Sequence, residues 1–86
     1  MDVSMMLLNH EQPFVTQRFA ERLALLVIRE KYAPEIFNPK LSHIEDKGDA
    51  WWVTLSNSAF QDAAIPFARL LVVKIRKTNG EILGIG

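Results

Sequence analysis

The stretch that decides the fold lies near the carboxyl end of the chain and reads Arg69-Leu-Leu-Val-Val-Lys-Ile-Arg-Lys-Thr-Asn-Gly-Glu-Ile-Leu-Gly-Ile85. Its first half, residues 70–75, is rich in branched apolar side chains, which favour a strand. The Asn79-Gly80 pair can supply the positive φ angles of a tight turn, and a second apolar run follows it. The stretch therefore predicts a β-hairpin.

The register of this hairpin follows from side-chain parity. A two-residue turn would scatter the apolar side chains of the second strand over both faces. A three-residue loop over 78–80, closed by a left-handed glycine in a bulge, instead pairs Ile75 with Leu83. It also pairs Val73 with Ile85. We expect this second arrangement, in which one face is apolar and consists of Leu71, Val73, Ile75, Leu83 and Ile85.

Length and composition bound the class of protein. Eighty-six residues form a single domain, 1–86, with 1–12 as an N-terminal arm. The absence of cysteine excludes disulfides and thiolate zinc sites and fits a cytoplasmic protein. The apolar run 3–8 is too short to span a membrane. Ten basic residues balance ten acidic ones, so we expect neither nucleic acid nor a membrane as a partner.

Upstream of the strands, residues 14–32 have the period of an amphipathic helix. The helix starts between Pro13, which suits a first turn, and Thr16, which is a competing cap. Pro34 ends it. One apolar stripe is expected to pack on the hairpin and consists of Val15, Phe19, Leu23, Leu26 and Val27. A second stripe, covered by residues 1–10, a loop or another molecule, consists of Phe14, Leu25, Ile28 and Tyr32.

A second hairpin lies between the helix and the terminal one. Residues 41–46 and 50–56 have strand patterns, and Lys47-Gly48-Asp49 supplies the turn. In the second of these strands Trp51 belongs to the apolar face, so its neighbour Trp52 points outward. An outward tryptophan on an open sheet face is a candidate binding anchor; the alternative is that a loop covers it.

Two connectors are more apolar than solvated loops need to be. Ile36 and Phe37 are expected to close an edge of the sheet. Residues 57–68, where Ser58 begins a capping-box pattern, form either a flap over the core or a lobe that faces a partner. Together the elements predict an α+β fold of two layers, with one long N-terminal helix packed on four antiparallel strands.

Signatures of chemistry are absent from the sequence. No nucleophile elbow, phosphate-binding loop or dinucleotide fingerprint occurs, and His10 and His43 are isolated. We therefore expect no metal, no cofactor and no enzymatic activity. Four cations along the last strands are interpreted as a device against edge-to-edge aggregation, which outweighs nucleic-acid binding: Arg69, Lys74, Arg76 and Lys77.

Several segments carry a resemblance to a known family. They are the helix rich in alanine and leucine, Tyr32, the Asn38-Pro39 connector, Trp51-Trp-Val53, and Val73-Lys-Ile-Arg-Lys-Thr-Asn-Gly-Glu-Ile-Leu83. Over residues 15–86 the chain resembles the small bacterial immunity proteins of the nuclear transport factor 2 fold, also called cystatin-like. The resemblance implies a curved sheet that cradles the helix. The chain departs from it at 58–67, where members tend to have a glycine-rich segment.

The resemblance also implies a function, which is to bind a cognate toxin and occlude its active site without any catalytic residue. Such a surface needs an aromatic anchor and complementary charges. Our candidates are Trp52, Phe60 and Asp62, with Glu45, Asp46 and Asp49 as an acidic group that could meet a basic nuclease cleft. Two alternatives are an accessory module that forms a homodimer and a small-ligand-binding domain. The chain leaves little room for the pocket of about 300 Å³ that a ligand domain needs.

Overall fold

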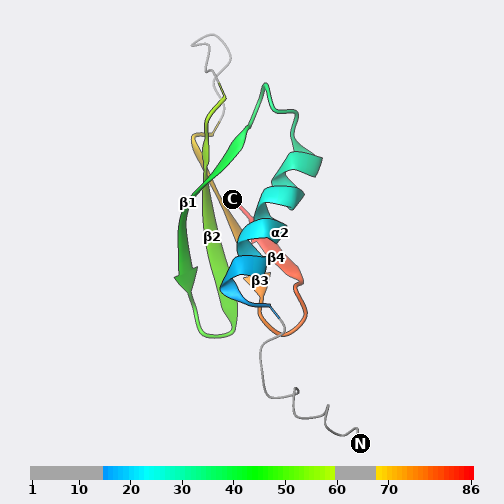
Figure 1. Ribbon diagram of the computed structural model, residues 1–86, viewed down its shortest axis with the longest axis vertical. Coiled ribbons are helices and arrows are strands. Elements are labelled where there is room, and N and C mark those ends of the chain that lie inside the picture. The colour runs from blue at the N-terminus through cyan, green and yellow to red at the C-terminus, as the bar shows by residue number, and fades with distance from the viewer. Residues whose placement is uncertain (1–14, 60–67) are drawn as a thin grey trace, which may run out of the picture.

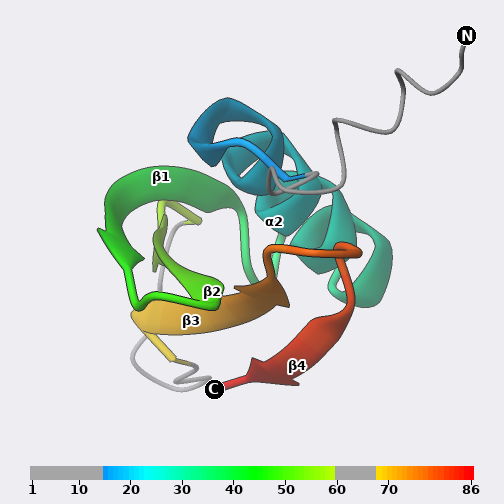
Figure 2. The same cartoon turned by 90° about the horizontal axis from the view of Figure 1, so that it is seen from below.

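The computed structural model describes residues 15–59 and 68–86. Within these ranges the elements are α2 (Gln17–Lys31), β1 (Pro39–Asp46), β2 (Ala50–Asn57), β3 (Leu70–Arg76) and β4 (Ile82–Ile85). The strands form one antiparallel sheet in the order β1-β2-β3-β4, and α2 covers one of its faces (Figure 1). The predicted α+β fold of two layers is thus confirmed. The sheet curves around the helix (Figure 2).

The helix starts at one of the two predicted positions. Thr16 is the N-cap, and its hydroxyl oxygen accepts a hydrogen bond from the backbone N–H of Phe19 at 3.1 Å. Pro13 lies outside the described residues. The helix ends at Lys31, because Tyr32 is already extended ahead of Pro34. No helix among the described residues is both long and apolar enough to cross a membrane.

The face that α2 buries differs from the predicted stripe. Ala20, Ala24 and Ile28 are fully buried, whereas Phe19 and Leu26 are 50% and 54% exposed. The buried residues lie four apart and form one ridge, along which two alanines let the helix backbone approach the sheet closely. The predicted stripe includes large apolar side chains only. It therefore lies on a different side of the helix from the ridge of Ala20, Ala24 and Ile28.

Part of each predicted stripe nevertheless contributes to the core. Val15 is buried and Leu23 packs against the core, as expected. From the second stripe, Ile28 is fully buried, and Leu25 and Tyr32 are partly buried and pack against the core. That stripe is therefore part of the helix–sheet interface and does not need cover from another molecule at these positions.

The connector between α2 and β1 closes the core with one side chain. Phe37 is fully buried, and its ring lies 6.1 Å from that of Tyr32. Ile36 is exposed, so only one of the two predicted plugs serves this role. The predicted segment 57–68 falls mostly on residues 60–67, which lie outside the described residues, so that prediction stays a prediction.

The terminal hairpin has the predicted pairing at its far end and a different one near the turn. Val73 pairs with Ile85, as expected, but Ile75 pairs with Ile82 instead of Leu83. The loop has four residues, 77–80, because the backbone N–H of Arg76 still donates to the backbone oxygen of Glu81 across it at 2.9 Å. Leu83 is an extra residue on β4 that restores the register, and it is exposed.

The turn chemistry of both hairpins agrees with the sequence. Gly80 has a φ of +77° and Gly48 a φ of +89°, a region that disfavours other residues. At the first turn the Asp46 carboxylate also accepts a hydrogen bond from the Gly48 backbone N–H at 2.9 Å. The first hairpin thus joins β1 to β2 where predicted, and it fixes which way Trp52 points.

Candidate functional site

The face of the sheet opposite α2, which we call the outer face, carries Trp52. Its neighbours in sequence on β2 belong to the other face, where Val53 is fully buried and Trp51 packs against the core. Across the sheet, Trp52 lies between Glu45 of β1 and Lys74 of β3. The predicted outward direction of Trp52 therefore agrees with the strand register.

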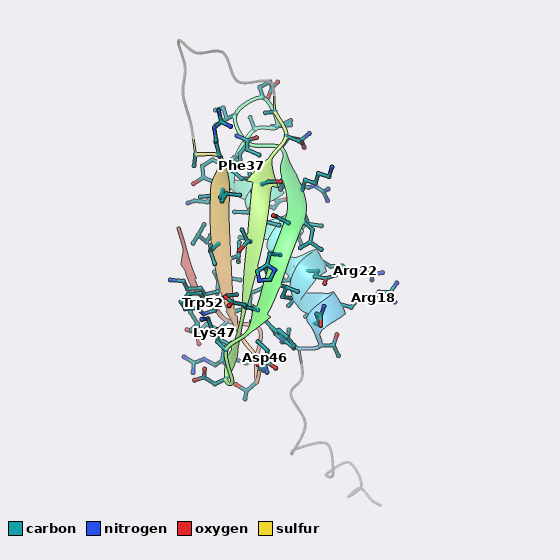
Figure 3. All side chains as sticks on the ribbon, turned by 90° about the vertical axis from the view of Figure 1, so that its left-hand side faces the viewer. Arg18, Arg22, Phe37, Asp46, Lys47 and Trp52 are labelled. Carbon is teal, nitrogen blue, oxygen red and sulfur yellow. The ribbon has the colours of Figure 1, made fainter. Side chains whose placement is uncertain are left out.

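Two lysines hold the indole of Trp52 in place. The ammonium groups of Lys47 and Lys74 each lie 4.5 Å from the centroid of its ring. Lys74 comes from β3 and Lys47 from the β1–β2 turn, where it lies beside Trp52 (Figure 3). A cation over an indole contributes about 0.5 to 1 kcal/mol at exposed positions. These contacts favour one arrangement of the ring and the two ammonium groups.

The charges around this tryptophan are only partly neutralised. Lys47 lies 3.7 Å from a carboxylate oxygen of Glu45, and Arg76 lies 3.2 Å from one of Glu81. Within the part of the chain that the structure describes, Lys74 has no carboxylate oxygen within 4.0 Å. Among the described residues, the ammonium group of Lys74 therefore has the Trp52 ring as its contact and no carboxylate.

Away from Trp52, the outer-face side chains of β2 and β3 are uncharged and partly apolar, whereas β1 places Lys40 opposite Ser56. One step along the strands from Trp52 lie Thr54 and Val72, and one step further lie Ser56 and Leu70. Leu70 is 55% exposed. A charged end at Lys74 and an apolar end at Leu70 therefore share one face of β3.

The edge strand leaves this face unobstructed. Gly84 is the cross-strand neighbour of Lys74, and Gly86 exchanges two backbone hydrogen bonds with Val72. A Cβ atom at Gly84 would meet Lys74 Cδ at an ordinary 3.9 Å, and one at Gly86 would meet nothing within 4 Å. The β4 side of the outer face is thus a shelf of backbone beside Lys74 and Val72.

Trp51 has a structural role on the opposite face. Its indole N–H donates to the backbone oxygen of Val15 at 2.9 Å. Lys77 lies over its ring at 4.4 Å and also contacts the Asp46 carboxylate. The hydrogen bond from Lys77, together with the one from the Gly48 backbone, lowers the pKa of Asp46 below its ordinary value of 3.8.

The predicted acidic group is close together but largely engaged within the chain. Asp46 is paired with Lys77, and Glu45 with Lys47. Asp49 is exposed in the turn, where its backbone oxygen accepts from Lys77 at 3.0 Å. The other two predicted residues, Phe60 and Asp62, lie outside the described residues. Whether these residues bind a partner stays a prediction.

The sequence did not indicate the two lysines at Trp52. Lys74 was interpreted as an edge device, but β3 is an interior strand. The signal that would have found it is the register of β2 against β3, which places Trp52 opposite Lys74. The long segment between these strands hides that register, because the turn rules that fix short hairpins do not apply to it.

Metal binding has no support in the described ranges, since no group of three His, Cys, Asp or Glu side chains there could hold an ion. His43 is exposed on β1. Comparisons with protein-family models, with curated proteins and with solved structures found no match for this chain. We therefore infer function from the outer face and from the resemblance of the sequence.

Proposed function

We propose that this protein binds another protein through the outer face around Trp52 and thereby inhibits a cognate bacterial toxin. The observation that carries the proposal is a partly exposed indole on an open sheet face, held by Lys47 and Lys74 at 4.5 Å each. Tryptophan is enriched among the residues that dominate binding energy, and an anchor that is already ordered loses little entropy on binding.

The inhibitory step follows from the resemblance to immunity proteins. An inhibitor that occludes an active site needs a rigid surface and no catalytic group of its own. The helix-backed sheet supplies such rigidity, because interior strands β2 and β3 are tied on both sides. The acidic turn residues, together with Phe60 and Asp62, remain candidates for the rim of the interface. The protein would act in the bacterial cytoplasm, where the toxin is made.

The test uses the protein encoded next to this one as the candidate toxin. Both proteins are purified, and the Kd is measured by calorimetry together with the inhibition of the toxin's activity. Trp52→Ala should weaken binding by about 30-fold, which corresponds to a hot-spot loss of about 2 kcal/mol.

A matched control for this substitution lies on the helix. Arg22→Ala truncates a large, exposed side chain of α2 that lies apart from Trp52, and it should leave the Kd unchanged (Figure 3). The proposal fails if the two proteins do not bind, or if both variants bind as the unmodified protein does. Equal losses for both variants would mean that the outer face is not the specific surface.

Self-association is a second candidate function, and one observation favours it. Phe19 and Leu26 leave large apolar side chains half exposed on α2. Light scattering at micromolar concentration distinguishes the two functions. A dimer that Leu26→Asp converts into a monomer would favour a homodimerising module. The third alternative, a small-ligand pocket, gains nothing from the described core, where Ile28, Phe37 and Leu55 are fully buried between helix and sheet.

A further inference from the structure

We propose that the outer face recognises an extended acidic segment of the partner, with a carboxylate at Lys74 and an apolar side chain at Leu70. This inference rests on the proposed protein-binding function and specifies the chemistry that the partner must present. The acidic turn would suit a basic partner, whereas this inference calls for an acidic one. The reason is that Lys74, beside Trp52, has no carboxylate partner among the described residues.

The anion site consists of two ammonium groups around one ring. Lys47 and Lys74 both lie 4.5 Å from the centroid of the Trp52 ring, so a carboxylate at Lys74 binds next to one ammonium group with a second positive charge at the same ring. Glu45 offsets Lys47 only weakly at 3.7 Å. Hydrogen bonds between an ammonium group and a carboxylate are about twice as strong as neutral ones. Because the contacts with the ring favour these lysine positions, an incoming anion loses less entropy in ordering them.

The apolar end fixes the length of the segment. Lys74, Val72 and Leu70 point to the same face of β3, and alternate residues of a strand are about 6.6 Å apart. Leu70 therefore lies about 13 Å from Lys74, which is the distance between residues i and i+4 of an extended chain. An acidic residue followed by an apolar one four positions later matches both ends.

The shelf beside β4 leaves room for such a segment. Gly84 and Gly86 place no side chain next to Lys74 or Val72, and the space at Gly86 is open to 4 Å. A partner backbone can thus lie along the face where side chains would otherwise stand. A larger residue at Gly84 would enter this space without changing the core.

A protein segment fits this surface better than a single-stranded nucleic acid does. Along β2 and β3 the cations lie next to Trp52, and the path from there to Leu70 passes the uncharged Thr54 and Val72, with Lys40 of β1 beside its far end. A nucleic-acid groove needs cations along the whole path. Both ammonium groups lie over the ring, so the indole is not a free platform for a base. The other end, at Leu70, is apolar. The net charge of zero also supplies no long-range attraction to phosphates.

The first test titrates the ¹⁵N-labelled protein with the synthetic peptide acetyl-Glu-Thr-Ser-Thr-Leu-amide. The amide signals of Val72 and Lys74 should shift, and replacing the peptide's Glu by Gln should weaken binding about tenfold. Equal binding of the two peptides, or tighter binding of a single-stranded oligonucleotide of five nucleotides, would overturn the inference. So would the absence of any shift at these two residues.

The second test places a competing charge in the shelf. Gly84→Glu puts a carboxylate beside Lys74, and Gly84→Gln has the same size without the charge. Gly84 does not need a positive φ, and its Cβ atom would meet only an ordinary contact, so both variants should fold. The Glu variant should bind the acidic peptide and the toxin at least about tenfold more weakly than the Gln variant.

The outcomes separate this inference from the proposed function. Equal losses in the Glu and Gln variants would keep the outer face as the binding surface and overturn the acidic-segment inference. If neither variant nor Trp52→Ala changed toxin binding, the proposed surface itself would be wrong. A larger loss of binding for Gly84→Glu than for Gly84→Gln supports both the proposed surface and the acidic-segment inference.

Discussion

The indole N–H of Trp51 donates to the backbone oxygen of Val15 at 2.9 Å, and this bond ties β2 to the residue that precedes the helix cap. The backbone N–H of Val15 in turn donates to the backbone oxygen of Lys77 at 3.0 Å. Both backbone groups of Val15 are thus paired, and the start of α2 is fixed relative to the sheet. Trp51 and Trp52 are adjacent in sequence and lie on opposite faces, where Trp51 stabilises the fold and Trp52 is the proposed binding anchor.

This difference predicts unequal effects on stability. Trp51→Phe removes the donor to Val15 and should lower the free energy of unfolding by about 1 kcal/mol or more. Trp52→Phe keeps an aromatic ring for the two lysines and should change the free energy of unfolding by less than about 0.5 kcal/mol. Urea unfolding of both variants measures this. Equal losses would contradict the structural role of Trp51.

The buried face of the helix predicts a second pair of effects. Ala24 is fully buried, so Ala24→Leu should destabilise the protein by about 1 to 3 kcal/mol through overpacking. Leu26 is 54% exposed, so Leu26→Ala should cost less than about 1 kcal/mol. Thermal unfolding compares the two variants. A large loss for Leu26→Ala with none for Ala24→Leu would restore the stripe that the sequence suggested.

The sequence predicted the strands better than the helix face, for a physical reason. Parity is a rule with period two within a strand, so Trp51 and Val53 of β2 had to share one face, as had Val73 and Ile75 of β3. On a helix, several stripes compete, and large exposed residues such as Phe19 outweigh small buried ones such as Ala24 in any apolar count. Close packing favours the small residue, and that preference depends on the sheet, which the local pattern does not contain.

The site was predictable in part. The outward direction of Trp52 followed from the strand pattern, but its two lysine neighbours depend on the β2–β3 register and on the β1–β2 turn. The bulge at Leu83 was missed because a four-residue loop ending at Gly80 uses the same turn residues as a three-residue one. Only the tertiary pairing distinguishes them.

The Asp46–Lys77 pair predicts a dependence of stability on pH. The hydrogen bond from Lys77 lowers the pKa of Asp46 in the folded state below the ordinary 3.8. Its stabilising contribution is complete above 3.8 and is lost as the pH falls through the lowered value, because the unfolded state then binds more protons. In Asp46→Asn this part of the pH dependence should disappear. Urea unfolding at several pH values around 3.8 measures the free energy of unfolding of the unmodified protein and of Asp46→Asn. The same dependence on pH for both proteins would contradict the prediction.

The left-handed glycine of the terminal turn predicts a backbone effect. Gly80 has a φ of +77°, so Gly80→Ala should cost about 1 to 2 kcal/mol, and Gly80→Asn should cost less. A Cβ atom there would meet Val15 and Leu23 only at 3.7 and 3.8 Å, so the loss is conformational rather than steric. Gly84→Ala, without a positive φ, is the matched control. Similar losses at both positions would mean that the turn conformation is not responsible.

The central claim is that the outer face around Trp52 is the binding surface, and the two indole N–H signals test it most directly. The ¹⁵N-labelled protein is titrated with the protein encoded beside it. We predict that the Trp52 signal shifts or broadens as the complex forms, while the Trp51 signal, held by its bond to Val15, stays in place. A complex that forms with the Trp52 signal unchanged would contradict the claim.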